Sequence, residues 1–109
     1  GGGCVISNYV YIGLNAHVHQ WINIGEGAML GMNSATTINV PPFMTVVGVP
    51  SKVIKINLEG LKRRNIDNQD IEVFQEYLQN KNLLMLESSN YLINRYIKFI
   101  TNNNKFLHI

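Results

Sequence analysis

Aliphatic residues recur at intervals of six through the first part of the chain, at Ile6, Ile12, Val18, Ile24 and Leu30. A second register, two residues earlier in each unit, holds small or aliphatic side chains: Cys4, Val10, Ala16, Ile22, Ala28 and Ser34. A period of six matches neither the 3.6-residue repeat of a helix nor the two-residue repeat of a single strand. It is typical of the hexapeptide parallel β-helix, in which three units of strand and turn close a triangular coil of about eighteen residues.

This coil length makes definite predictions about neighbours. Val18 should stack on Thr36, and Ile12 on Leu30. We expect left-handed or other special backbone angles at turns that carry Gly or Asn, at Gly13, Gly25, Gly31, Asn8, Asn15, Asn33 and Asn39. The repeat weakens at residues 36–38 and ends at residues 40–42, where two prolines lack the donor that pairing between coils needs.

Residues 1–50 are therefore predicted to form the β-helix, and residues 51–109 a C-terminal segment of different character. Residues 43–49 should form a last apolar strand, residues 48–50 a turn, residues 52–56 an edge strand and residues 57–64 a short basic helical turn. Two further helices are predicted. The first is capped by Asp67 and buries Ile71, Phe74, Tyr77 and Leu78; the second starts near Ser88 or Ser89 and buries Leu92, Tyr96, Phe99 and Ile100. Residues 101–109 are expected to fray.

Composition excludes several classes of protein. The chain has 109 residues, only 15% of them charged, and a formal net charge of +2. Its single cysteine, Cys4, cannot form an internal disulfide and is expected to be a small core residue. One basic segment does not make a nucleic-acid groove, and residues 83–100 are too polar for a membrane span. The start within a repeat, without a secretory signal, suggests the C-terminal part of a longer protein.

Three stretches resemble one enzyme family in the same order: residues 19–25 (HQWINIG), residues 40–43 (VPPF) with Gly48 and Pro50, and residues 56–64 (INLEGLKRR). The family is the acyl-carrier-protein-dependent UDP-N-acetylglucosamine O-acyltransferases, and the resemblance covers about residues 1–80. It implies a left-handed parallel β-helix followed by a small helical region. It also implies transfer of a 3-hydroxyacyl group from acyl carrier protein to the sugar 3-hydroxyl, the first step of lipid A synthesis, by a cytoplasmic homotrimer without a bound cofactor.

The resemblance implies that Asn57, Glu59, Arg63 and Arg64 contact the nucleotide part of the substrate. Their chemistry is suitable, because Asn can pair with a uracil edge, Glu can accept from ribose hydroxyls and Arg can fork onto phosphate oxygens. The same basic segment can attract an acidic acyl carrier protein. The alternative is a solvated basic turn without a ligand.

His19 and Gln20 are implied to line the substrate pocket, and Met32 to set the depth of the acyl-chain groove. A bulky side chain at position 32 would close a groove that Gly leaves long, which predicts a shorter acyl chain. The alternatives are a polar β-helix surface for the first pair, and simple packing at a turn or between subunits for Met32. His17 and His19 share a face if the strand extends over both, but no third metal ligand is apparent.

The general-base His that the reaction needs is implied to lie upstream of Gly1, so no catalytic residue is assigned in this chain. No Ser-His-Asp or Cys-His arrangement replaces it. Two other functions remain open. One is a related hexapeptide transferase acting on another nucleotide sugar through an acyl-coenzyme A; the other is a non-catalytic trimeric β-helix that binds or scaffolds a partner.

Overall fold

The computed structural model describes residues 2–80 and 90–103. Six strands of two residues each come first, in the order β1 (Val5–Ile6), β2 (Tyr11–Ile12), β3 (His17–Val18), β4 (Asn23–Ile24), β5 (Met29–Leu30) and β6 (Ala35–Thr36). Two longer strands follow, β7 (Met44–Gly48) and β8 (Ser51–Ile56). Three helices complete the described chain: α1 (Leu58–Arg63), α2 (Asn68–Gln79) and α3 (Tyr91–Asn103).

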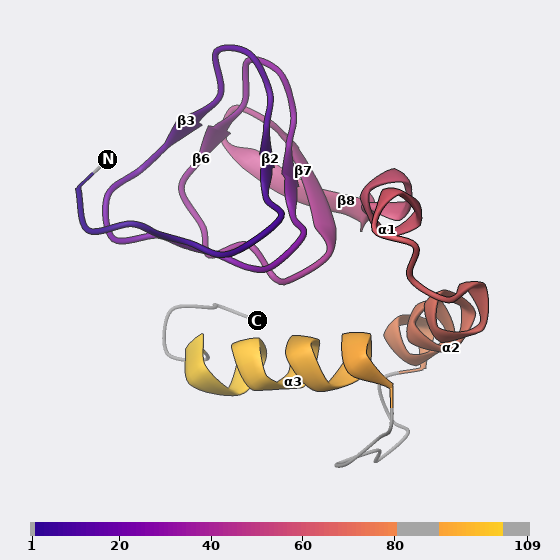
Figure 1. Ribbon diagram of the computed structural model, residues 1–109. Coiled ribbons are helices and arrows are strands. Elements are labelled where there is room, and N and C mark those ends of the chain that lie inside the picture. Colours follow the sequence, from indigo (N-terminus) through magenta and orange to yellow (C-terminus); the bar gives the residue numbers. More distant parts are fainter. Residues whose placement is uncertain (1, 81–89, 104–109) are drawn as a thin grey trace.

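The short strands wind into a triangular coil with one strand on each face (Figure 1). β1 pairs with β4, β2 with β5 and β3 with β6, all in parallel. Ile12 pairs with Leu30 and Val18 with Thr36, which confirms both predicted neighbours. The chain therefore advances by eighteen residues per coil, as the hexapeptide period requires.

The next coil is shorter, because Ile24 bridges Val40 and Leu30 pairs with Val46, sixteen residues further on. The predicted apolar strand is confirmed as β7, and the edge strand as β8, which runs antiparallel to β7. Side chains of the six-residue repeat point into the coil, as predicted, and Ile24, Leu30, Val40 and Val46 are fully buried there. In the first coil Ile6 and Ile12 point the same way but remain about half exposed.

Backbone angles correct the predicted role of the turn residues. Left-handed φ values fall on every sixth residue, at Gly3, Tyr9, Asn15, Trp21, Gly27 and Asn33. Asn15 and Asn33 were predicted correctly, whereas Tyr9 takes this conformation in place of Asn8. Asn39 has no positive φ; its side chain instead accepts a hydrogen bond from the Asn23 amide at 2.8 Å. The glycine that follows an inward residue is needed for close approach, since a Cβ on Gly25 would lie 2.5 Å from the nitrogen of Pro42.

Local capping determines where the helices begin. The Asp67 side chain accepts from the Gln69 amide at 2.7 Å, which confirms the predicted cap of α2. At α3 the Asn90 side chain accepts from the amides of Leu92 and Ile93, so the helix begins after Asn90. The starts predicted at Ser88 and Ser89 lie outside the described residues. The fraying expected from residue 101 is wrong for residues 101–103, which continue α3.

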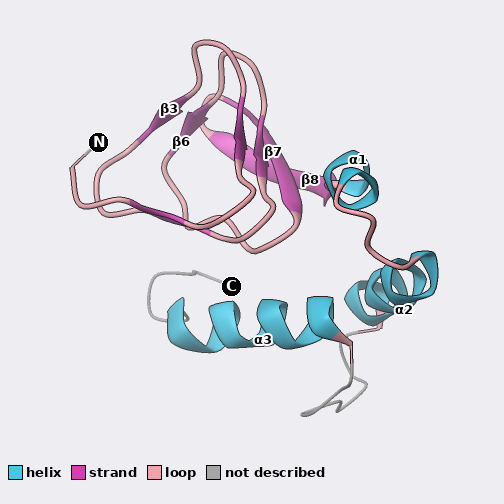
Figure 2. Cartoon of the chain, viewed as in Figure 1, coloured by secondary structure: helices cyan, strands magenta, loops and turns pink. Residues whose placement is uncertain are grey.

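The helices share a second core with the end of the coil, and α3 runs beneath one side of the triangle (Figures 1 and 2). Phe43 and Phe74 meet edge to face with ring centroids 5.7 Å apart, and Leu61, Leu92 and Ile93 are buried around them. Within residues 2–80 and 90–103, no helix is long and apolar enough to cross a membrane.

Candidate functional site

An open groove of about 1250 Å³ lies between α1 and the sheet that contains β2, β5, β7 and β8. The coil, the β7–β8 pair and the first two helices all contribute to its walls, through Tyr11, Ile12, Gly13, Met29, Thr45, Lys55, Ile56, Asn57, Leu58, Glu59, Gly60, Lys62, Arg63 and Gln75. This volume is above the usual range of about 300–1,000 Å³ for small-molecule sites. Three of the four residues proposed to contact a nucleotide therefore lie on one surface.

Charge in this groove is predominantly positive. Lys55, Lys62 and Arg63 face it, with Glu59 as the acidic lining residue. Glu59 and Arg63 form an ion pair of 2.5 Å on the exposed side of α1, with side chains 76% and 60% exposed. Pairs this exposed contribute little to folding stability, so a ligand can replace the ion pair at small cost. The arrangement can accept a phosphate group and hydrogen-bond a hydroxyl.

Asn57 lies at the groove wall, but its amide serves the fold. Its Oδ1 accepts from the Gly60 amide at 3.2 Å, and its Nδ2 donates to the Gly27 carbonyl at 3.0 Å. The first bond caps α1, and the second anchors the helix to the turn between β4 and β5. Asn57 thus fixes the position of Glu59 and Arg63, which follow within about two turns.

Arg64 points away from the groove and into a separate buried cluster. Its Nη2 donates to the Glu26 carboxylate at 3.0 Å, and its guanidinium stacks over the Tyr9 ring at 3.8 Å. Both side chains of the ion pair are largely buried, at 14% and 12% exposed. The Arg64 Nη1 is buried and finds no hydrogen-bond partner among the described residues. An unsatisfied buried donor is costly, and the Tyr9 ring stacked on the guanidinium offsets part of that cost.

Glu26 is the centre of this cluster, and sequence reasoning missed it. Besides Arg64, its carboxylate accepts from the Tyr91 hydroxyl at 2.5 Å and from the Arg95 Nε at 3.3 Å. A side-chain hydrogen bond between Arg95 and Tyr91, with the nearby charges of Tyr91 and Glu26, raises the pKa of Arg95. One signal was available, since Glu26 is the single acidic residue among the first fifty. Tyr11, Lys55 and Gln75 in the groove were also missed, although Tyr11 stands next to an inward residue and so faces outward.

The remaining predicted residues lie at other corners of the triangle. His19 and Gln20 are exposed in the turn between β3 and β4, where the His19 amide donates to the Thr36 carbonyl at 2.9 Å. Met32 is 66% exposed in the turn between β5 and β6. The groove instead lies along β2, β5, β7 and β8, and none of His19, Gln20 and Met32 lines it, so one chain does not bring the three groups together. His17 lies within β3 and His19 beyond its end, and the described residues contain no metal-binding cluster of His, Cys, Asp or Glu.

Comparison with known proteins shows the family to which this chain belongs. The family described as "Udp N-acetylglucosamine O-acyltransferase; Domain 2" matches residues 39–105. The acyl-[acyl-carrier-protein]–UDP-N-acetylglucosamine O-acyltransferase of Leptothrix cholodnii is 35% identical over 88 residues, covering 70% of this chain and 33% of that protein. The protein of the same name from Verminephrobacter eiseniae is 44% identical over 63 residues, covering 58% and 24%.

A solved structure agrees in fold. The UDP-N-acetylglucosamine acyltransferase from Campylobacter jejuni superposes with a TM-score of 0.73 at 23% identity, over 91% of this chain and 50% of that one. The present chain spans between about a quarter and a third of the length of the two curated relatives. The matched family covers more than half of the chain and includes the segment that builds α1. The chain belongs to the UDP-N-acetylglucosamine O-acyltransferase family.

Proposed function

We propose that this chain is the C-terminal part of an enzyme that transfers a 3-hydroxyacyl group from acyl carrier protein to the 3-hydroxyl of UDP-N-acetylglucosamine, as the first step of lipid A synthesis. The observation that carries the proposal is the positively charged groove along α1 in a chain of this family. A UDP-sugar presents two phosphates, a ribose and a base, and the groove offers basic groups beside a carboxylate. No bound cofactor is required, because the acyl donor arrives on its carrier protein.

In this proposal Arg63 holds the diphosphate, with Lys55 and Lys62 contributing to the surrounding positive field. Glu59 is released from Arg63 and accepts from a ribose hydroxyl. Asn57 positions α1 at the nucleotide. Arg64 is turned away from the groove, so the nucleotide contact expected from the resemblance is not part of this proposal; held by Glu26 through Nη2, Arg64 instead fixes the end of α1 to the coil.

A complete pocket needs further walls, and we propose that other copies of the chain supply them in a homotrimer. His19, Gln20 and Met32 then contribute from neighbouring corners, His19 and Gln20 at the substrate and Met32 at the end of the acyl chain. Exposed apolar side chains favour such self-association. Leu14, Met32, Val47 and Val49 are 77%, 66%, 39% and 73% exposed. Leu14, Met32 and Val47 lie near the same corner of the triangle in successive coils.

The rest of the proposal follows the family resemblance. The coils wind left-handed, residues 1–50 form the β-helix, and residues 51–109 form the C-terminal segment. The general-base His lies upstream of Gly1, and the enzyme acts in the cytoplasm. The basic surface of α1 is also suited to an acidic carrier protein.

Titration of the protein with UDP-N-acetylglucosamine by calorimetry tests this function. We expect saturable binding that Arg63→Gln weakens by about tenfold or more, equivalent to roughly 1.4 kcal/mol. Lys52→Gln is the matched control, because Lys52 is an exposed cation of β8 outside the groove. Equal weakening by both variants would indicate only non-specific charge attraction. Lack of binding by the parent chain would favour a scaffolding β-helix, and selective binding of another nucleotide sugar would favour the related transferase.

A further inference from the structure

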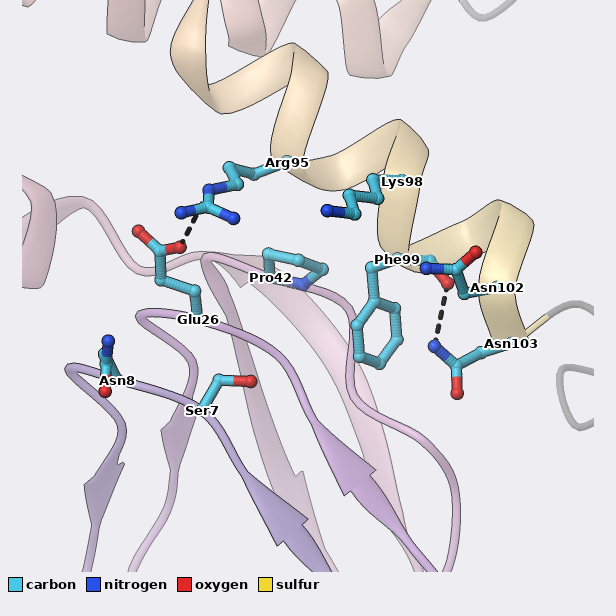
Figure 3. Close-up of a pocket in the computed structure, with 9 residues that line it drawn as sticks. All are labelled: Ser7, Asn8, Glu26, Pro42, Arg95, Lys98, Phe99, Asn102 and Asn103. Carbon is cyan, nitrogen blue, oxygen red and sulfur yellow. Dashed lines mark hydrogen bonds and ion pairs between the residues drawn. The ribbon is translucent and has the colours of Figure 1, made fainter.

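A second cavity, of about 330 Å³, separates α3 from the corner of the β-helix (Figure 3). It shares no lining residue with the groove along α1. Its walls come from the turns after β1 and β4, from Pro42 and from the inner side of α3. The volume is at the lower end of the range of small-molecule sites, so it suits a compact ligand.

The electrostatic balance of this cavity is positive. Glu26 is its one acidic lining residue, and both of its carboxylate oxygens already accept from Arg64, Tyr91 or Arg95. Arg95 uses its Nε for this contact and also interacts with Tyr91, but its side chain remains 48% exposed and its guanidinium keeps its positive charge at the cavity. Figure 3 shows the side chains of Arg95 and Lys98 extending from α3 over Pro42.

Lys98 contributes a second available cation. Across residues 2–80 and 90–103, no hydrogen bond or ion pair engages its ammonium group. Among the lining residues, the cations Arg95 and Lys98 outnumber the single carboxylate of Glu26, which leaves a formal net charge of +1 at the cavity. Two cations at one concave site favour an anion, and arginine in particular matches the oxygens of a phosphate.

The rest of the lining favours a sugar skeleton on that anion. The ring of Phe99 lies beside Pro42 and gives the cavity an apolar surface (Figure 3), against which the carbon face of a small ring can pack. Asn8 lines the cavity from the coil and Asn102 from α3 (Figure 3), and both side chains carry donors and acceptors for hydroxyl groups.

We propose that this cavity binds a small sugar phosphate. Its phosphate group contacts Arg95 and Lys98, its ring packs on Phe99 and Pro42, and its hydroxyls hydrogen-bond to Asn8 and Asn102. The site is separate from the groove for the UDP-sugar, and its occupant holds α3 against the coil through both surfaces at once.

The test uses glucose 6-phosphate as the probe, titrated into the full chain by calorimetry. We expect saturable binding that Lys98→Gln weakens by about tenfold and that the control Lys52→Gln leaves unchanged, since both variants remove one exposed lysine charge. Glucose should not bind, because it lacks the anion, and inorganic phosphate should bind more weakly, because it lacks the ring.

Three results would overturn the proposal. These are failure of glucose 6-phosphate to bind, equal affinity for inorganic phosphate, and binding that is lost in Arg63→Gln but kept in Lys98→Gln. The last result would place the anion in the groove along α1. UDP-N-acetylglucosamine binding is measured separately in each variant, so failure here leaves the proposed function untouched.

Discussion

Replacement of Glu26 by Gln tests how strongly the helices are held to the β-helix. The carboxylate is only 12% exposed and joins the turn between β4 and β5 to Arg64 of the α1 C-cap and to Tyr91 and Arg95 of α3. Gln keeps the volume and one acceptor oxygen but removes the charge. Arg64, 14% exposed, then loses its counter-ion while it remains buried.

The expected cost follows from burial. Removing one partner of a buried pair typically costs about 3–5 kcal/mol, because the other charge is left uncompensated. The contact with Arg95 adds little, since that side chain is 48% exposed. Because Gln retains one acceptor, we expect the lower end, about 3 kcal/mol in the free energy of unfolding. At an m-value of about 1–3 kcal/mol/M, the urea midpoint falls by about 1–3 M.

The assay is urea unfolding followed by far-ultraviolet circular dichroism. Glu59→Gln is the matched control, because it removes the same charge from another Glu–Arg pair whose side chains are 76% and 60% exposed. That variant should lose no more than about 0.5 kcal/mol. If the two variants shift the midpoint equally, the argument that Glu26 is a desolvated junction between three elements is refuted.

Three further changes have defined expectations. Leu30→Ala empties a fully buried position between Ile12 and Val46 and should cost about 2–5 kcal/mol in urea unfolding; a loss below about 1 kcal/mol would argue against a packed coil interior. Burial raises the pKa of Tyr96 above its usual value, so its phenol favours the folded state less as pH rises above about 10. Tyr96→Phe should therefore reduce the alkaline loss of stability, and an unchanged pH profile would contradict this. Met32→Gly in the complete enzyme should shift preference toward longer acyl donors, and an identical chain-length profile would exclude Met32 as the determinant.

Regular local patterns were predictable because each repeats or stays close in the chain. The six-residue spacing predicted the coil-to-coil partners Ile12 with Leu30 and Val18 with Thr36, since a period converts directly into a stacking interval. The cap at Asp67 depends on an amide only two residues away, so it could also be predicted from the sequence. The left-handed angles at Tyr9 and Trp21 were not, because neither residue type favours that conformation and the coil imposes it.

The site divides in the same way. The basic segment 57–64 was recognisable as a candidate ligand surface by its composition and family resemblance, and the structure places Asn57, Glu59 and Arg63 in one groove. The direction of Arg64 depended on Glu26, thirty-eight residues earlier, and on Tyr91 and Arg95 beyond it.

The sequence by itself therefore determined the repeat, its inward register and the basic segment, because those properties reside in spacing and residue type. Only the tertiary structure decided which charges meet, which donors stay unsatisfied and where the two cavities lie. Those outcomes depend on how α1 and α3 dock against the corner of the coil. Docking brings residues from distant parts of the chain within hydrogen-bonding distance, and no local pattern encodes that distance.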